Sequence, residues 1–207
     1  MNIDPYIRYT LRGRGTTCWA VEDQQGNRFL IKDYWVSDGR KPEFELLSEV
    51  KEVPGVCKMV CYKAQRAKTK DYRGRLNAYS HGDLFRNRTA VRIVLKSYGS
   101  TIDKFKSAKQ LLAALRDAIA AHSTLIGKGL LHRDVSPDNI LLGLGEALEG
   151  FRGVLIDLHM AIKSDRPVNE ICQDLRSGTP IFYPLIALQS RKLDPAMTPA
   201  HDYLDDV

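Results

Sequence analysis

The sequence of 207 residues lacks several features that would mark it as a membrane or secreted protein. It contains no apolar run of membrane-spanning length, and its first residues, MNIDPYIRYT, lack the apolar core of a signal peptide. It has only four cysteines, of which Cys57 and Cys61 alone lie close together, so no zinc spacing is present. We therefore expect an intracellular protein, cytoplasmic or nuclear, with reduced thiols and no membrane association.

Negative charge is scarce in one segment, residues 63–92, which carries nine Lys and Arg against two Asp and contributes much of the net charge of +6. A basic segment can attract nucleic acid or acidic substrates. Few aromatic residues and no nucleic-acid recognition motif accompany this charge. We therefore expect a solvated loop rather than a nucleic-acid interface.

Hydrophobic residues make up 43% of the chain, enough for a packed core in one domain or a bilobed unit. The first sixty residues predict strands and one helix. Apolar runs at 18–21 and 28–32 around a Gln-Gln-Gly-Asn turn indicate a hairpin, and two more strands are expected at 58–63 and 90–96. After Pro42 the apolar spacing becomes helical, with one face formed by Glu43, Leu46, Leu47 and Val50.

A long helix is predicted from Ser107 to the glycines at 127 and 129, followed by two short strands at 139–142 and 153–156. Its apolar stripe recurs at spacings of three and four residues and comprises Leu112, Leu115, Ile119, His122 and Ile126. Three further residues widen it: Leu111, Ala118 and Leu125. The stripe is wide for a surface helix, so we expect it to be covered by other structure.

The segment LHRDVSPDNILL, residues 131–142, is the strongest indication of chemistry. It contains H-R-D followed by Asn five residues after the Asp, which is the catalytic-loop signature of protein kinases. Asp134 is positioned to accept the proton of an attacking hydroxyl, and Asn139 to hold a Mg²⁺ that neutralises the transferring phosphoryl group. Both are therefore predicted catalytic residues, with Asn139 also a metal ligand.

Three further segments complete the pattern. Asp157 follows an apolar strand, where kinases place the metal-binding Asp of D-F-G. Lys32 ends a strand and fits the lysine that contacts the α- and β-phosphates. That lysine needs an acidic partner on the next helix; Glu43, Glu45 and Glu49 are candidates, and Glu43 is chosen because it shares the apolar face.

Gly13 and Gly15 match the nucleotide loop G-x-G-x-x-G-x-V only in part, because Cys18 replaces the third glycine and Ala20 the valine. Their position one hairpin before Lys32 strengthens the assignment of the two glycines to a nucleotide loop. We predict that they contribute to cofactor binding together with Lys32, Glu43 and Asp157.

The ordered set resembles a protein kinase from the nucleotide loop to the activation segment. Four segments narrow the resemblance to the fungal-type protein kinases: KDYW at 32–35, LLAALRDAI at 111–119, HRDVS at 132–136, and RSGT at 176–179 followed by Phe182. The resemblance implies an α+β, bilobed kinase-like fold, with a β-rich N-lobe at 1–98 and a partial helical C-lobe at 99–207. It also implies ATP, Mg²⁺ and transfer to a Ser or Thr of a protein substrate.

Three departures leave a second reading open. Ser136 stands where most Ser/Thr kinases have a Lys, His159 replaces the Gly of D-F-G, and Ile186 falls near the expected Glu of A-P-E. The fungal-type family resembles this sequence in having Ser at 136, whereas the change at Ile186 favours a pseudokinase that binds nucleotide or serves as a scaffold without transferring phosphate. A small-molecule phosphotransferase is disfavoured by Gly178-Thr179, which resembles a protein-substrate loop.

The resemblance also implies that the C-lobe is truncated near the start of its central helix, since HDYLDDV at 201–207 resembles the beginning of that helix. Without the remaining helices, the apolar stripe of the 107–126 helix would be exposed. We therefore expect the chain alone to be marginally stable and inactive, or to bind a partner that covers this C-lobe surface.

Overall fold

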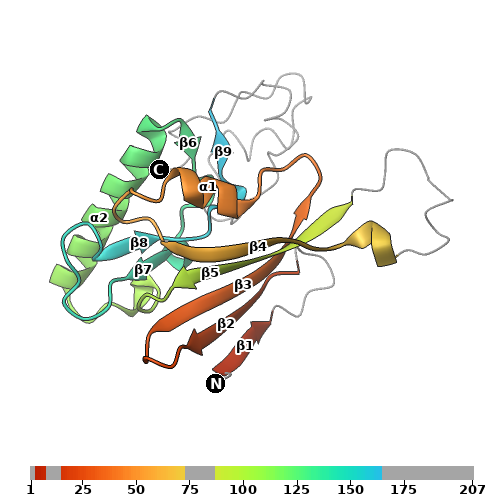
Figure 1. Cartoon of the computed structure of the whole chain (residues 1–207). Helices are drawn as coiled ribbons and strands as arrows, with labels where there is room; N and C mark the ends of the chain where they lie inside the picture. The colour runs from red at the N-terminus through yellow and green to blue at the C-terminus, as the bar shows by residue number, and fades with distance from the viewer. Residues whose placement is uncertain (1–2, 8–14, 73–86, 165–207) are drawn as a thin grey trace, which may run out of the picture. The chain divides into compact units, whose positions relative to one another are not determined.

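The computed structural model describes residues 3–7, 15–72 and 87–164, coloured along the chain in Figure 1. They group into two compact units, the first from the described parts of Met1–Glu49 and Lys58–Ser97, the second from those of Val50–Cys57 and Tyr98–Val207. Residues 50–57, assigned above to the N-lobe, therefore group with the second unit. The fold is α+β, as the sequence predicted.

The first unit is built on a five-stranded antiparallel sheet in the order β1-β2-β3-β5-β4. The strands are β1 (Ile3–Ile7), β2 (Thr17–Glu22), β3 (Arg28–Ser37), β4 (Met59–Lys68) and β5 (Arg88–Lys96). The expected hairpin is β2–β3, whose turn is closed by Asp23, since its Oδ1 accepts from the backbone N–H groups of Gln25 and Asn27 at 2.9 and 2.8 Å. The central strand β3 thus pairs with β2 over residues 28–33 and with β5 over residues 29–37.

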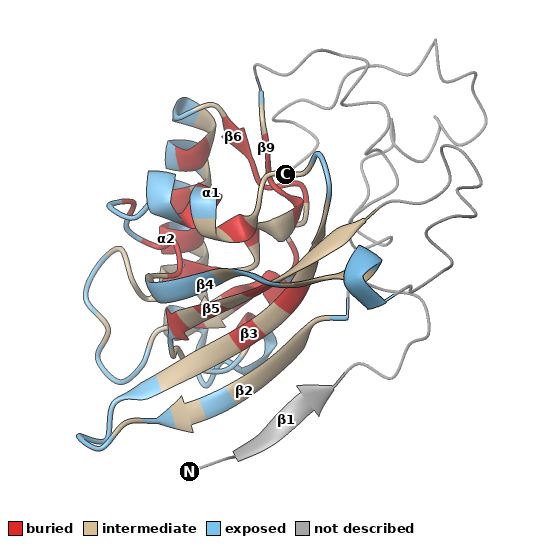
Figure 2. Cartoon of the chain, turned by 45° about the vertical axis from the view of Figure 1, so that its right-hand side comes forward, coloured by how far each residue is buried: buried red, intermediate tan, exposed pale blue. Residues whose placement is uncertain are grey.

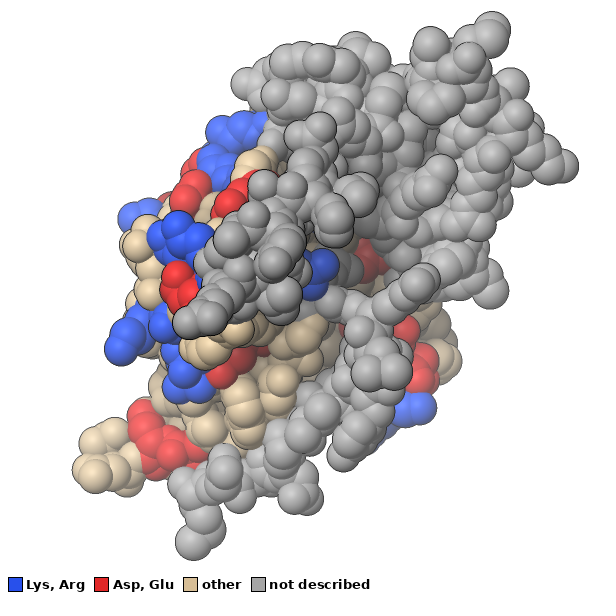
Figure 3. Space-filling model, turned by 90° about the vertical axis from the view of Figure 1, so that its right-hand side faces the viewer, with Lys and Arg blue, Asp and Glu red and all other residues tan. Residues whose placement is uncertain are grey.

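The basic segment is not a loop over its described residues, so that expectation was wrong. Most of residues 63–72 and 87–92 belong to β4, to the 3-10 helix η1 (Thr69–Tyr72) and to β5. Arg66 and Arg92 both bind Asp33, at 2.9 and 2.7 Å. Burial opposes ionisation of Asp33, but the hydrogen bonds from the two arginines outweigh it and lower its pKa. In Figure 3 acidic side chains likewise lie among the Lys and Arg of the visible face.

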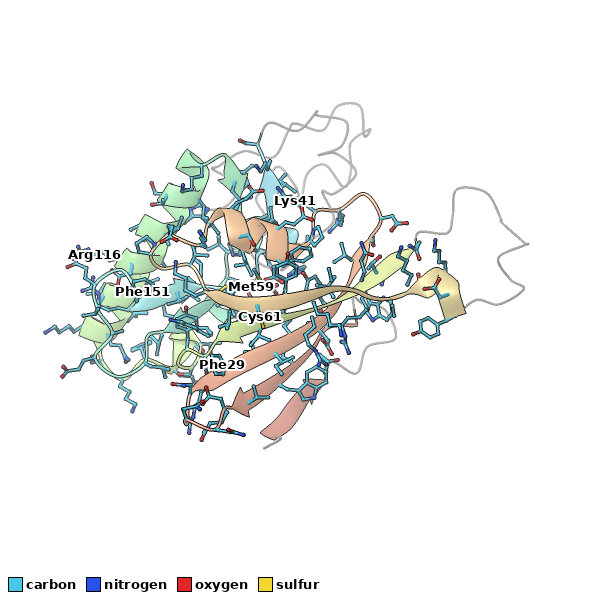
Figure 4. The ribbon with its side chains drawn as sticks, viewed as in Figure 1. Phe29, Lys41, Met59, Cys61, Arg116 and Phe151 are labelled. Carbon is cyan, nitrogen blue, oxygen red and sulfur yellow. The ribbon has the colours of Figure 1, made fainter. Side chains whose placement is uncertain are left out.

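Helix α1 (Glu43–Glu49) begins directly after Pro42, a residue favoured at helix starts. The predicted apolar face is confirmed, because Glu43, Leu46, Leu47 and Val50 are all buried. Phe44 stacks on Tyr62 of β4 with the ring centroids 4.2 Å apart, which attaches the helix to the sheet. Lys41, labelled in Figure 4, binds Glu49 at the end of the same helix.

The second unit contains the long helix α2 (Ala108–Gly127), which Ser107 caps by accepting a hydrogen bond from the backbone N–H of Gln110 at 3.2 Å. Two short antiparallel pairs accompany it, β6 (Leu130–Leu131) with β9 (Ile162–Lys163) and β7 (Ile140–Leu142) with β8 (Gly153–Leu155). The 3-10 helices are η4 (Ile102–Lys104), η5 (Pro137–Asn139) and η6 (Leu158–Met160). Among the described residues, no helix has both the length and the apolarity to cross a membrane.

The predicted apolar stripe of α2 is covered only in part. Leu112 and Ile119 are each 66% exposed, whereas Ala118 and Leu125 of the stripe are buried, together with Ala114, Asp117 and Ala121. Figure 2 shows the buried parts of the helix in red. The backbones of α2 and β8 approach closely, since a Cβ on Gly153 of β8 would lie 2.0 Å from the carbonyl oxygen of Ala114. Only a glycine fits at position 153, so β8 lies directly against the α2 backbone at Ala114.

Asp117 is the polar centre of this contact and was missed in the sequence. It is 3% exposed and accepts hydrogen bonds from the backbone N–H groups of Gly150 and Arg152 and from the Arg152 guanidinium, at 2.6–2.9 Å. These bonds from Arg152 lower the pKa of Asp117. Figure 4 labels Phe151 in the same loop and Arg116 on α2, which binds Glu149. Asp117 therefore anchors the segment that leads into β8.

We expect Asp117→Asn to lower the free energy of unfolding by about 2–3 kcal/mol, because it weakens charge-assisted hydrogen bonds to a buried group. Glu149→Gln, in the exposed pair with Arg116, is the matched control and should change stability by less than about 0.5 kcal/mol. Urea unfolding of the wild type and the two variants at pH 7 measures both changes in the free energy of unfolding.

The effect of Asp117→Asn should depend on pH. A carboxylate whose folded-state pKa is depressed contributes stability above the ordinary Asp value, about 3.9, and loses it as the pH falls through the folded-state pKa. The difference between wild type and variant should therefore shrink below about pH 4. An equal difference at pH 7 and pH 3 would contradict the ion-pair account.

Candidate active-site residues

Lys32 and Glu43 form a buried ion pair within the first unit. Lys32 Nζ donates to Glu43 Oε2 at 2.8 Å, and the two residues are 6% and 1% exposed. The other two candidates are both exposed, and Glu49 instead binds Lys41. Of the three glutamates, the structure thus pairs Glu43 with the lysine, which keeps the ammonium charged and directed out of β3.

Tyr34 is a third member of this cluster that the sequence analysis missed. It lies two residues after Lys32, so the period of the strand puts both side chains on one face of β3. The Lys32 ammonium is 5.7 Å from the centre of the tyrosine ring. Burial and then the charge of Glu43 raise the pKa of Tyr34, so its hydroxyl stays neutral. Tyr34 was missed because the expected strand ended at Lys32, whereas β3 continues to Ser37.

Gly15 has a backbone φ of 60°, which favours glycine, and a Cβ there would lie 3.1 Å from Trp35 Cδ1. The glycine is therefore required locally by the turn and by the Trp35 ring. Gly13 lies outside the described residues, so its predicted role in nucleotide binding is a matter of sequence alone.

His132 attaches the catalytic loop to the end of β8 in the second unit. Its side chain is fully buried, its Nε2 lies 3.0 Å from the carbonyl oxygen of Ile156, and its Nδ1 accepts from the Asp134 N–H at 3.3 Å. We assign the proton to Nε2, because this tautomer satisfies both contacts. The imidazole is thus a structural bridge between the loop and the strand that precedes Asp157.

Asn139 holds Asp134 in place. Its Nδ2 donates to the Asp134 backbone oxygen at 2.8 Å and to Asp134 Oδ2 at 3.0 Å. The chain reaches this position through η5, where the Asn139 N–H donates to the Ser136 carbonyl at 2.9 Å. The amide nitrogen is bound to Asp134. The remaining polar atom of the side chain is the amide oxygen, which is the atom that can bind a cation. The loop therefore presents a carboxylate and an amide oxygen together.

Asp157 is brought to the same loop by strand pairing. Strand β7 follows Asn139 and pairs with β8, and the Ile156 N–H donates to the Asn139 carbonyl at 3.0 Å. Asp157 itself has the left-handed backbone angles φ 67° and ψ 59°, and Arg133 has φ 63°. Such angles are uncommon outside glycine and often mark functional sites. Asp134, Asn139 and Asp157 are thus connected by backbone and side-chain bonds within one unit.

The oxygen donors in this loop fit a magnesium ion that also binds phosphate. Asn139 and Asp157 offer an amide and a carboxylate oxygen, both preferred by Mg²⁺. Within residues 15–72 and 87–164, no group of three or more His, Cys, Asp or Glu could hold a metal by itself. Mg²⁺ is usually held by one or two carboxylates plus substrate phosphates, so this donor set suits a metal–nucleotide complex.

Two features together define a protein kinase domain. One is a sheet unit with a buried Lys–Glu pair, and the other is a helical unit whose H-R-D loop is bonded to a strand that ends in an Asp. The family model described as fungal protein kinase matches residues 5–207. The chain belongs to this family, as the resemblance of its motifs predicted. A search of curated proteins finds no match.

We expect Glu43→Gln to lower the free energy of unfolding by about 3 kcal/mol, because it leaves the buried Lys32 ammonium without a countercharge. Glu45→Gln changes the same charge on an exposed face of the same helix and should cost less than about 0.5 kcal/mol. Chemical denaturation of the two variants compares them directly. Equal effects would show that the ion pair does not contribute to stability.

Proposed function

We propose that this chain is a protein serine/threonine kinase domain that transfers the γ-phosphoryl group of ATP to a hydroxyl of a protein substrate. The observation that carries the proposal is the pair of hydrogen bonds from Asn139 Nδ2 to Asp134. They join the predicted catalytic base to a predicted metal ligand in one loop. Membership of the kinase family supports protein substrates and the use of a nucleotide and a divalent metal in general.

Phosphate binding is assigned first to residues of the sheet unit. In the first unit we propose that Lys32, held by Glu43, neutralises the α- and β-phosphates, and that the backbone at Gly13 and Gly15 covers the phosphates. The buried ion pair supports this role, because it keeps Lys32 charged and restricts its rotamers.

Metal binding is assigned to Asn139 and Asp157. Bound Mg²⁺ would supply positive charge that offsets the charge developing on the transferring phosphoryl group. The protein's part is to orient the two oxygen ligands. It does so through the hydrogen bonds of Asn139 to Asp134 and through the αL backbone of Asp157.

Asp134 is assigned as the catalytic base. The acceptor hydroxyl gives its proton to the Asp134 carboxylate while its oxygen forms the new bond to phosphorus and the bond from phosphorus to the ADP oxygen breaks. Asp134 is only partly buried, so a substrate hydroxyl can reach it. The preference for Ser and Thr rests on the family resemblance as a whole, and the choice of a protein over a small molecule on Gly178-Thr179. These two residues lie outside the described residues, as does Ile186.

The alternative is a pseudokinase that binds nucleotide without transfer. It is favoured by Ser136, which is 2% exposed and stands where most Ser/Thr kinases have a lysine. A short buried hydroxyl supplies no positive charge to the γ-phosphate. Transfer and binding therefore have to be measured separately.

Asp157→Asn should abolish Mg-dependent binding of ATP while leaving the fold intact, because the amide removes one charged metal ligand. Wild-type protein with ATP at 100 times its dissociation constant should gain about 2.7 kcal/mol of stability with Mg²⁺ present. Thermal unfolding with and without ATP and Mg²⁺ measures the stabilisation of the wild type and its loss in Asp157→Asn. A wild type that Mg·ATP does not stabilise would refute nucleotide binding.

Asp134→Asn should reduce phosphoryl transfer by about 100-fold or more but change ATP affinity less than about threefold, since the base acts on the acceptor hydroxyl. Transfer from radiolabelled ATP to a mixed protein substrate is compared with ATP binding in the same preparations. No transfer by the wild type, with ATP binding retained, would favour the pseudokinase.

A further inference from the structure

We propose that His159 is a positioning residue that orients the carboxylate of Asp157 for its metal. This inference rests on the function proposed above. His159 occupies the position of the glycine in D-F-G, where most kinases have no side chain at all. In this chain the imidazole Nδ1 contacts Asp157 Oδ1.

The backbone around His159 fixes the direction of its ring. His159 is the middle residue of η6, and its neighbours Leu158 and Met160 are 0% and 2% exposed. The Ala161 N–H closes the turn by donating to the Leu158 carbonyl at 2.9 Å. The backbone of His159 is therefore anchored on both sides, and the contact of Nδ1 with Asp157 Oδ1 places the ring beside that carboxylate.

The tautomer of His159 follows from its surroundings. A carboxylate accepts hydrogen bonds and cannot donate, so the nitrogen that contacts it, Nδ1, carries the proton. The other nitrogen, Nε2, is buried and has no hydrogen-bond partner among the described residues. A proton there would leave a donor buried without an acceptor, which is costly. Of the two ring nitrogens, only Nδ1 makes a hydrogen bond among the described residues, and its acceptor is Asp157.

His159 thus binds one oxygen of Asp157 and restricts how the carboxylate can turn toward a cation. Partners that hydrogen-bond a metal ligand restrict its orientation, and their loss commonly weakens metal binding 10- to 100-fold. In a loop with glycine at this position the backbone alone would orient the Asp. Here a side chain does so, and the backbone freedom of glycine is absent.

Two variants of the full chain separate the hydrogen bond that His159 donates from the packing of its side chain. His159→Leu keeps an apolar side chain of similar size but has no donor, whereas His159→Asn places an N–H₂ where Nδ1 lies. The Mg²⁺ concentration that gives half of the Mg-dependent ATP binding should rise about 10-fold or more in His159→Leu and stay within about threefold in His159→Asn. ATP binding without metal should be unchanged in both.

The ¹⁵N chemical shifts of the His159 ring in the wild type provide a test that needs no variant and no metal. They should show the proton on Nδ1, and a proton on Nε2 alone would overturn the proposal. So would an unchanged Mg²⁺ midpoint in His159→Leu, or an equal rise in both variants. If the wild type binds ATP without any dependence on Mg²⁺, the proposed function of Asp157 fails and the role of His159 fails with it. A metal-dependent wild type with an unaffected His159→Leu overturns the role of His159 alone.

Discussion

Strand β8 approaches α2 so closely that there is no space for a Cβ between Gly153 and the Ala114 carbonyl. Asp117 reinforces the contact by binding Gly150 and Arg152 just before the strand. The far end of β8 continues into Ile156, whose carbonyl is bound by His132 and whose N–H is bound by Asn139. The position of Asp157, and its attachment to the catalytic loop, therefore depends on how β8 is seated on the helix.

In each of the two units, candidate residues have arrangements that cost free energy. Lys32 and Glu43 are buried charges, and Arg133 and Asp157 have left-handed backbone angles. Each such feature costs a few kcal/mol or less and persists only where its surroundings leave no alternative. The neighbouring β-sheet and the buried residues on either side of Asp157 provide that constraint. Rigidity of this kind suits a site that must align oxygen ligands and a base.

Two features that the sequence left open were decided by distant contacts. The apolar stripe of α2 was identified by its spacing, but its burial is uneven: Ala118 and Leu125 are buried, whereas Leu112 and Ile119 are exposed. The basic segment was interpreted by its charge, yet in the described residues strand pairing and Asp33 organise it. In both cases the deciding partner lies far along the chain, where local patterns carry no information about it.

The sequence by itself determined the elements whose signals are local: the β2–β3 hairpin, the buried face of α1, and the motif residues Asp134, Asn139 and Asp157. Periodicity and motif spacing suffice there because each pattern is set by neighbours within a few residues. Only the tertiary structure decided that Tyr34 joins the Lys32–Glu43 pair, that Asp117 anchors β8, and that His159 contacts Asp157. Those roles depend on how closely the backbones approach and which way each side chain points, and neither is encoded in residue spacing.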